Sequence, residues 1–347
     1  ADTHIASTTE THRDTCLDRM PQSPANWASW ANVAGLPHLP NTKGISADLT
    51  ALSSRMLLSC TEEEQLRGAS LGGDEAVVLT YSMRAHSALK QLDLSDSTIT
   101  AAAAAILGSS LGSLAVPLPK LESLVLARCP AGDAVANLFW PCMPRLTSLT
   151  TLDLSDALLS PISGTSLAQV LCAGSNIKIE TAKAITNGKI KTKPKTASEQ
   201  EGGPCVALQT LKLDGNSLLS TGVIALAQAL PQLPRLLTLQ LGGNGVSCDG
   251  ATALAVALAH PHCCTTTLIL NKNEVAMPGA HALMECVSTR STRSAPISLI
   301  DLTANPSLVG IAETHSLLRN PTLRLSPGTD SGSGSRRRVS SSRGCSR

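Results

Sequence analysis

LQTLKLDGNSLLSTGVIALAQALPQLPRLLTLQLGGNGV, residues 208–246, contains two copies of one pattern whose starts lie 28 residues apart. The pattern is L-x-x-L-x-L-x-x-N-x-L, which begins at Leu208 and begins again at Leu236. Self-similarity with a period of roughly 20 to 50 residues is typical of solenoids, in which each repeat packs only on its neighbours. This stretch therefore predicts a solenoid.

Further copies of the pattern extend in both directions along the chain. Seven copies align, and they start at Leu89, Leu121, Leu149, Leu208, Leu236, Thr265 and Ile297. Successive starts are separated by close to one period, except that the interval from Leu149 to Leu208 is about twice as long. The ninth position holds Asn in the later copies and Ser, Cys or Ala in the earlier ones, as Asn216, Asn244, Asn273, Asn305, Ser97, Cys129 and Ala157.

Each copy predicts one strand followed by one helix. The L-x-L core alternates as a strand does, so the leucines point inward and the residues between them point outward. An Asn after the strand can satisfy the buried polar atoms of the turn through its side chain. The segments from Gly222, Gly250 and Gly279 have apolar residues at helical spacing and many alanines, which predicts a short helix packed closely on the strand.

This pattern resembles the leucine-rich repeat family, and a period near 28 with a full helix per repeat looks like its ribonuclease-inhibitor-like subtype. The resemblance covers roughly residues 71–318. It implies an α/β fold, a leucine-rich-repeat solenoid or horseshoe, with parallel strands on the concave face and helices on the convex face.

The repeats define the expected domains. Residues 1–45 are expected to be irregular, residues 46–325 to form the repeat domain, and residues 326–347 to be a disordered basic tail. Within the domain, repeats are expected at about 89–325, after a cap or decayed repeat at about 46–88 with helices over 47–71 and 74–86. A terminal helix is expected near Leu308 to Leu318.

The double-length interval between Leu149 and Leu208 has two explanations. One is a flexible basic insertion at about 174–204, between a helix and the next strand, where solenoids usually accept insertions. The other is a degenerate repeat, in which Ile177 and Ile179 form the L-x-L pair and Gly188 takes the glycine position. The stretch 189–201 contains a proline and no leucine, so it is a poor source of the required helix, and the insertion is favoured.

Composition supports an extended solenoid over an ordinary globular core. Only five of the 347 residues are aromatic, whereas large rings supply much of the buried area in most cores. The net charge is +2, but residues 326–347 carry five Arg and one Asp, and residues 177–201 carry six Lys and three Glu. The remainder, which is mostly the repeat body, therefore carries a net charge of −5.

The cysteine pattern favours an intracellular, cytoplasmic protein. There are eleven cysteines, an odd number, without any C-x-x-C pair, which is typical of reduced thiols. No secretory leader and no apolar run of membrane-spanning length is visible, so no membrane span is expected.

Candidate chemistry is sparse, and neither a catalytic site, a cofactor nor a metal is expected. Asp93 and Asp153 occupy equivalent outward positions, but they lie two repeats apart, at an assumed spacing of about 10 Å per repeat, too far for shared catalysis. The run from His260 to Cys264 is interpreted as a connecting loop, because adjacent cysteines cannot easily complete a tetrahedral site. Gly242 to Gly245 is interpreted as a turn, since the Lys-Ser/Thr ending of a phosphate loop is missing. Ser340, which follows three arginines, is a possible phosphorylation site.

The outward strand residues are the expected binding site. They are small, polar and weakly charged, and they include almost no Trp, Tyr or Arg, the residues that dominate very tight interfaces. Those expected to contact a partner are Gln91, Asp93, Ser95, Thr151, Asp153, Ser155, Thr210, Lys212, Asp214, Gln240, Asn271 and Asp301.

The favoured hypothesis is a non-catalytic, intracellular protein-protein interaction module or scaffold, monomeric or part of a larger assembly, which binds a protein partner. Nucleic acid is not expected as a partner, because no aromatic side chains accompany the basic residues. One alternative is a regulator of a small GTPase, since the Ran GTPase-activating protein family has this repeat subtype. That family typically ends in an acidic segment, whereas this tail is basic. A second alternative is the sensor fragment of a nucleotide-binding leucine-rich-repeat receptor.

Overall fold

The leucine pattern forms a row of short parallel strands in the computed structural model. The structure describes residues 63–85, 89–111, 120–130, 132–140, 143, 146–172, 207–290, 295–308 and 322–325. Within these residues one sheet contains nine strands, ordered along it as β1 Glu63–Gln65, β3 Gln91–Asp93, β5 Ser123–Val125, β6 Thr151–Asp153, β7 Thr210–Lys212, β8 Thr238–Gln240, β9 Thr267–Ile269, β10 Leu299–Asp301 and β11 Leu323–Arg324. A second sheet pairs β2 Ser70–Leu71 with β4 Thr98–Ile99.

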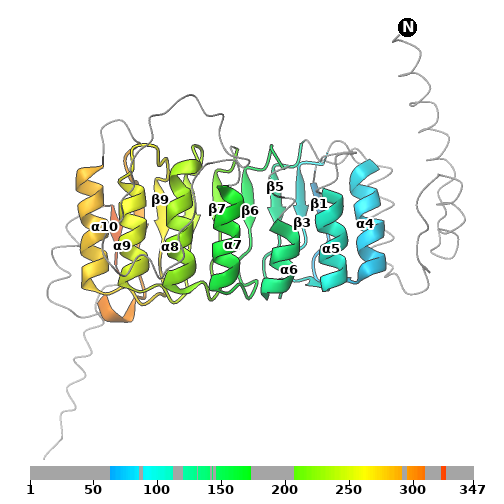
Figure 1. Cartoon of the computed structure of the whole chain (residues 1–347), viewed down its shortest axis with the longest axis horizontal. Coiled ribbons are helices and arrows are strands. Elements are labelled where there is room, and N and C mark those ends of the chain that lie inside the picture. The colour runs from blue at the N-terminus through cyan, green and yellow to red at the C-terminus, as the bar shows by residue number, and fades with distance from the viewer. Residues whose placement is uncertain are drawn as a thin grey trace, which may run out of the picture.

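Helices form a second layer in front of this sheet (Figure 1). They are α4 Gly73–Ala85, α5 Ala101–Leu111, α6 Gly132–Phe139, α7 Pro161–Leu171, α8 Leu219–Ala229, α9 Cys248–Leu258 and α10 Met277–Thr289, with 3₁₀ turns η4 Leu230–Gln232 and η5 Pro306–Leu308. The helix row in Figure 1 spreads wider than the strand row behind it. Paired strands lie about 4.8 Å apart and packed helices about 8 to 10 Å apart, so the strands occupy the inner side of the array.

Equivalent residues of successive repeats pair directly. Leu92 pairs with Leu124, Leu124 with Leu152, and Leu152 with Leu211, and the same register continues to Ile300. All these pairs are parallel, as a strand and helix order requires. The chain is therefore an α/β leucine-rich-repeat solenoid, as the sequence predicted.

The inward leucines form one continuous core. The two leucines of each L-x-L pair are at most 7% exposed, from Leu92 and Leu94 through Leu239 and Leu241. Burying one leucine stabilises a fold by roughly 1.5 to 3 kcal/mol, so a row of such pairs provides much of the driving force for folding.

Buried asparagines join neighbouring repeats. The side chain of Asn216 accepts hydrogen bonds from the backbone N–H groups of Ala157 and Leu159 at 3.0 Å, and it donates to the carbonyls of Leu154 and Leu213 at 2.9 Å. Asn244, Asn273 and Asn305 make equivalent bonds further along. The predicted role of Asn at the turn is confirmed.

Glycine lets the helices α7 and α8 approach closely. A Cβ atom built on Gly164 would lie 3.0 Å from the Cα atom of Gly222, and one built on Gly222 would lie 3.2 Å from the Cα atom of Pro161. Because these contacts are with backbone atoms, the two helices would have to move apart to accept a larger side chain.

The ends of the array differ from the sequence expectation. Residues 63–71 form β1, a turn and β2, where a helix was expected, because Glu63–Gln65 pairs in register with Gln91–Asp93. The expected helix at 74–86 is present as α4. At the other end β11 pairs with β10, a strand that the pattern did not predict. Of the expected terminal helix, residues 309–318 lie outside the described residues.

The sheet continues across the long interval without a gap. β6 pairs directly with β7, so no strand from residues 173–206 lies between them. Those residues lie outside the described part of the chain, as do residues 1–62 and 326–347. The domain boundaries that involve them, including the insertion at 174–204, remain predictions.

Candidate binding face

The outward side chains of the strands and of the turn after each strand form one surface, which we call the strand face. All twelve residues expected to contact a partner lie on it, because the strands have the predicted alternation. Their exposure varies. Gln91 is exposed, and most of the others are half-buried, whereas Ser95, Asp153 and Asp301 are 3%, 9% and 8% exposed.

Three of the aspartates are anchored to the turn that follows them. One carboxylate oxygen of Asp93 accepts hydrogen bonds from the backbone N–H and the hydroxyl of Ser95. Asp153 holds Ser155 in the same way, at 3.1 and 2.7 Å, and Asp301 accepts from the N–H of Thr303 at 2.9 Å. These carboxylates therefore stabilise the turns and cannot be treated only as ligands for a partner.

Ion pairs tie consecutive repeats across the strand face. Arg67 contacts Asp93 at 2.6 Å, Lys212 contacts Asp153 at 3.2 Å, and the guanidinium of Arg128 donates to Asp96 at 2.8 Å. Partial burial on its own would raise the pKa of Asp93, but the hydrogen bonds from Ser95 and Arg67 outweigh it and lower that pKa. The Asp93 carboxylate is therefore held in its charged form.

Asp214 is in the opposite situation. Burial raises the pKa of Asp214, the nearby Asp153 and Asp156 carboxylates raise it further, and a hydrogen bond from the backbone of Gly242 at 2.6 Å only partly offsets this. Within the described residues, neither Asp156 nor Asp214 is in an ion pair.

The turn after each of the strands β1, β3 and β5 to β10 has one residue in the left-handed region. The φ angles are between +54° and +70° at Gly68, Asp96, Arg128, Asp156, Gly215, Gly243, Lys272 and Ala304. Five of these residues are not glycine, although only glycine adopts such angles without strain. The sequence pattern missed Asp96, Arg128 and Asp156 as face residues because it followed only the alternating strand positions. Arg67 was missed because its repeat was not recognised.

A recess of about 150 Å³ lies on the strand face across β1, β3 and β5. It is lined by Gln65, Arg67, Gln91, Leu92, Asp93, Ser123 and Val125. Its amides, hydroxyl and ion pair supply hydrogen-bond donors and acceptors, and Leu92 and Val125 add a small apolar area. Such a lining suits a polar side chain of a protein partner.

The two equivalent aspartates are two strands apart, as expected. Asp93 is in register with Val125, and Val125 with Asp153. Paired strands are about 4.8 Å apart, so the assumed spacing of about 10 Å per repeat was too large on this side of the solenoid. Two steps still separate the carboxylates by roughly 10 Å, which leaves them independent of one another.

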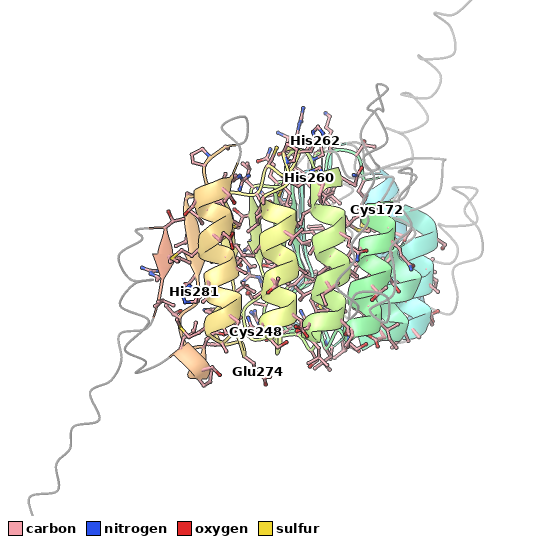
Figure 2. The ribbon with its side chains drawn as sticks, turned by 60° about the vertical axis from the view of Figure 1, so that its left-hand side comes forward. Cys172, Cys248, His260, His262, Glu274 and His281 are labelled. Atoms are coloured by element: carbon pink, nitrogen blue, oxygen red, sulfur yellow. The ribbon has the colours of Figure 1, made fainter. Side chains whose placement is uncertain are left out.

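The His and Cys residues do not gather into one site. Figure 2 shows His260, His262 and Cys172 at one edge of the solenoid, and Cys248 and Glu274 at the opposite edge. Cys263 is buried in the loop after α9, whereas His260 and His262 are less buried. In the described ranges, no three His, Cys, Asp or Glu side chains are placed to hold one metal ion.

The buried thiols are poor nucleophiles. Burial raises the pKa of Cys129 to about 11, and burial likewise raises the pKa of Cys286 to about 11. A thiol with such a pKa is almost entirely protonated at neutral pH, and the thiolate is the reactive form. Separately, none of the described helices has the length and hydropathy needed to cross a membrane.

No protein-family model and no curated protein sequence matches this chain. An internalin C2 from Listeria monocytogenes is similar over 83% of this chain and 96% of its own, with 17% identity and a TM-score of 0.35. A leucine-rich-repeat protein of Leptospira interrogans is similar over 79% of this chain and 80% of its own, with 14% identity and a TM-score of 0.26. At these values the likeness says nothing of function.

Proposed function

We propose that this protein is a non-catalytic protein-protein interaction module or scaffold, which binds a protein partner through the strand face. The observation that carries the proposal is the register of the sheet. It aligns outward side chains from repeat after repeat into one surface, from Gln91 on β3 to Asp301 on β10, and most of them are polar, with Val125, Ile269 and Leu299 as apolar members. A surface of this kind suits an extended contact with another polypeptide.

The charge of the strand face disfavours nucleic acid as the partner. On β1 to β7 and the turns after these strands, among the described residues, the five carboxylates of Asp93, Asp96, Asp153, Asp156 and Asp214 outnumber the cations Arg67, Arg128 and Lys212, of which Arg67 pairs with Asp93. A surface that binds a phosphate backbone needs the reverse balance. We also propose that the repeats belong to the ribonuclease-inhibitor-like subtype, and that the protein acts in the cytoplasm as a monomer or as part of a larger assembly.

The test is partner capture with variants that block the face without weakening the fold. Alanine at Asp93 or Asp153 would remove hydrogen bonds to turn backbone, so these positions are unsuitable. Thr210 and Gln240 are half-buried on the strand face, and their substitution by arginine adds bulk and charge there. The matched control places arginine at Thr252 and Val256, which are exposed on α9.

The expected outcome is a partner that is captured from cell extract by the unmodified chain and by the α9 variant, but not by Thr210→Arg/Gln240→Arg. Binding of the purified partner would then be measured directly by calorimetry, with an expected loss of at least tenfold in affinity. Equal binding by both variants would exclude the strand face as the site.

A further inference from the structure

A strip of carboxylates lies at one edge of the strand face. It consists of Asp153 at the end of β6, Asp156 in the following turn and Asp214 after β7, and we call it the acidic strip. Lys212 is the cation among them, so the strip has three carboxylates and one ammonium group. Asp153 pairs with Lys212 at 3.2 Å, and Arg128, whose charge also acts on Asp153 and Asp156, pairs with Asp96. Asp156 and Asp214 are therefore left without an ion-pair partner among the described residues.

Neighbouring glycines, which have no Cβ atom, leave space for these carboxylates to lie against the turns. A Cβ atom built on Gly215 would lie 1.8 Å from Oδ1 of Asp156, so the Asp156 side chain occupies the space above that glycine. Oδ1 of Asp214 accepts from the N–H of Gly242 at 2.6 Å, which leaves its second oxygen without a donor among the described residues. The side chain of Asn271 also lies over Gly242, where a Cβ atom would be 2.0 Å from its oxygen. A row of oxygen acceptors therefore runs from β6 to β9.

The basic C-terminal segment leaves the sheet at this same edge. All strands of the main sheet are parallel, and β11 pairs in register with β10, with Asp301 opposite Arg324. Residues after Leu325 therefore start at the end of the strands where Asp156 and Asp214 lie. The segment 326–347 contains Arg336, Arg337 and Arg338.

The length of the connecting segment matches the distance to the acidic strip. From β11 to β7 is four steps along the sheet and to β6 is five, or roughly 19 to 24 Å at about 4.8 Å per step. The stretch between Leu325 and Arg336 reads SPGTDSGSGS. A Gly/Ser-rich linker of this length has a root-mean-square end-to-end distance of roughly 18 Å. The effective concentration of a tethered group is highest when these two lengths agree, and it then reaches the order of millimolar.

We propose that Arg336, Arg337 and Arg338 bind the acidic strip of the same molecule. Each exposed ion pair contributes only about a factor of two to five in affinity, so a free peptide would bind weakly. The tether changes this, because at a millimolar effective concentration a contact with a millimolar dissociation constant is populated about half of the time. Lys272 and Arg324, which lie nearer to β11 than the acidic strip does, repel the arginines. Two carboxylates also lie nearer to β11: Asp301 is buried and in register with Arg324, and Glu274 is a single exposed group two residues from Lys272.

The contact between the arginines and the acidic strip does not depend on the proposed function, but it would compete with a partner that binds the strand face. A partner that uses β6 to β8 would have to displace the arginines. Phosphorylation of Ser340 would place a charge of about −1.5 to −2 beside them and weaken the contact.

Zero-length carbodiimide cross-linking of the full-length protein tests the contact, because it joins a carboxylate only to an amine that touches it. Arg336→Lys, Arg337→Lys and Arg338→Lys together keep the charge and supply the amines. We expect cross-links from these positions to Asp153, Asp156 or Asp214, located by mass spectrometry, with a yield that falls at least fivefold in 1 M salt, where screening is nearly complete.

When Asp156→Asn and Asp214→Asn are added to the variant that carries the three lysines, the total yield of cross-links from the tail should fall at least fivefold. Asp249→Asn/Glu285→Gln removes the same number of charges from exposed positions on α9 and α10 and should leave the yield within twofold. Cross-links shared evenly with Asp249 and Glu285, or cross-links to the strip only from lysines of residues 177–201, would overturn the proposal. So would cross-links that form only between isotopically distinct copies of the chain.

Discussion

At the residue scale, the same side chain has opposite effects at different places on the strand face. Asp93 is surrounded by donors, namely the backbone N–H and hydroxyl of Ser95 and the guanidinium of Arg67. Asp214 is more buried, lies near two other carboxylates and has one backbone donor. Asp93 stands between the two leucines of its L-x-L pair, whereas Asp214 follows the second leucine of its pair. The donors and charges that each position meets decide which carboxylate stabilises the fold.

We predict that Asp93→Asn and Asp214→Asn change the pH dependence of stability in opposite directions. The folded-state pKa of Asp93 is lowered, so its contribution is present above the usual Asp pKa of 3.8 and is lost as pH falls through the lowered value. The pKa of Asp214 is raised, so its ionisation costs stability as pH rises from 3.8 through the raised value.

Urea unfolding at pH 7 should therefore show a loss of about 1 kcal/mol for Asp93→Asn, the usual value for one hydrogen bond, and no loss or a gain for Asp214→Asn. Both differences should shrink as pH falls: for Asp214 below its raised pKa, and for Asp93 below 3.8 toward its lowered pKa. A larger loss for Asp214→Asn than for Asp93→Asn at pH 7 would contradict this explanation.

At the element scale, the asparagine side chains join one strand and turn to the next. Asn216 alone satisfies two backbone N–H groups of the preceding repeat and two carbonyls, all of them buried. Ala157 holds the equivalent position one repeat earlier and cannot make such bonds. Asn216 therefore adds a side-chain connection between the α7 and α8 repeats to the pairing of β6 with β7 and the close packing of the two helices.

We predict that Asn216→Ala lowers the free energy of unfolding by about 2 to 4 kcal/mol, because it leaves several buried backbone groups without partners. Asn271→Ala is the matched control, since the Asn271 side chain is half-buried and makes no hydrogen bond with described residues. It should cost at most about 0.5 kcal/mol in the same urea titration. Equal losses for the two variants would show that the hydrogen bonds of the buried Asn216 side chain add little to the free energy of unfolding.

The sequence predicted the inner elements of the solenoid better than its ends. The L-x-L pairs located the seven strands β3 and β5 to β10, since each inner strand must bury its leucines between two neighbours. β1 was missed because Glu64 stands in register with Leu92, where the pattern requires leucine. β11 was missed because Asn320 precedes Leu323 at the position of the first leucine. An end strand packs against one neighbour only, so its pattern is less constrained.

The strand face was predicted in part for a related physical reason. Alternation along a strand fixes which side chains point outward, and this gave the twelve expected residues. The charged turn residues Asp96, Arg128 and Asp156 adopt positive φ angles that glycine would have signalled in the sequence. Hydrogen bonding between repeats selects these conformations, as from the N–H of Asp156 to the carbonyl of Asp214 at 2.7 Å, and a single repeat does not encode it.

At the scale of the whole molecule, one connection is much longer than its equivalents. The segment between the end of α7 at Leu171 and the start of β7 at Thr210 is several times as long as the segments that join α8 to β8 and α9 to β9. Because β6 and β7 pair directly, the sheet does not need the additional length.

We predict that deletion of residues 174–203, which makes the connection from α7 to β7 as short as the one from α9 to β9, preserves the fold. Closing a shorter loop costs less conformational entropy. The free energy of unfolding should therefore be unchanged or rise by about 1 kcal/mol. Thermal unfolding followed by circular dichroism measures this, with a variant whose residues 174–203 are replaced by a Gly/Ser sequence of equal length as the control. If residues 174–203 are an insertion, both variants should be at least as stable as the unmodified chain. A segment that packs against the solenoid would instead make both variants lose several kcal/mol, because each would uncover the surface on which it packs.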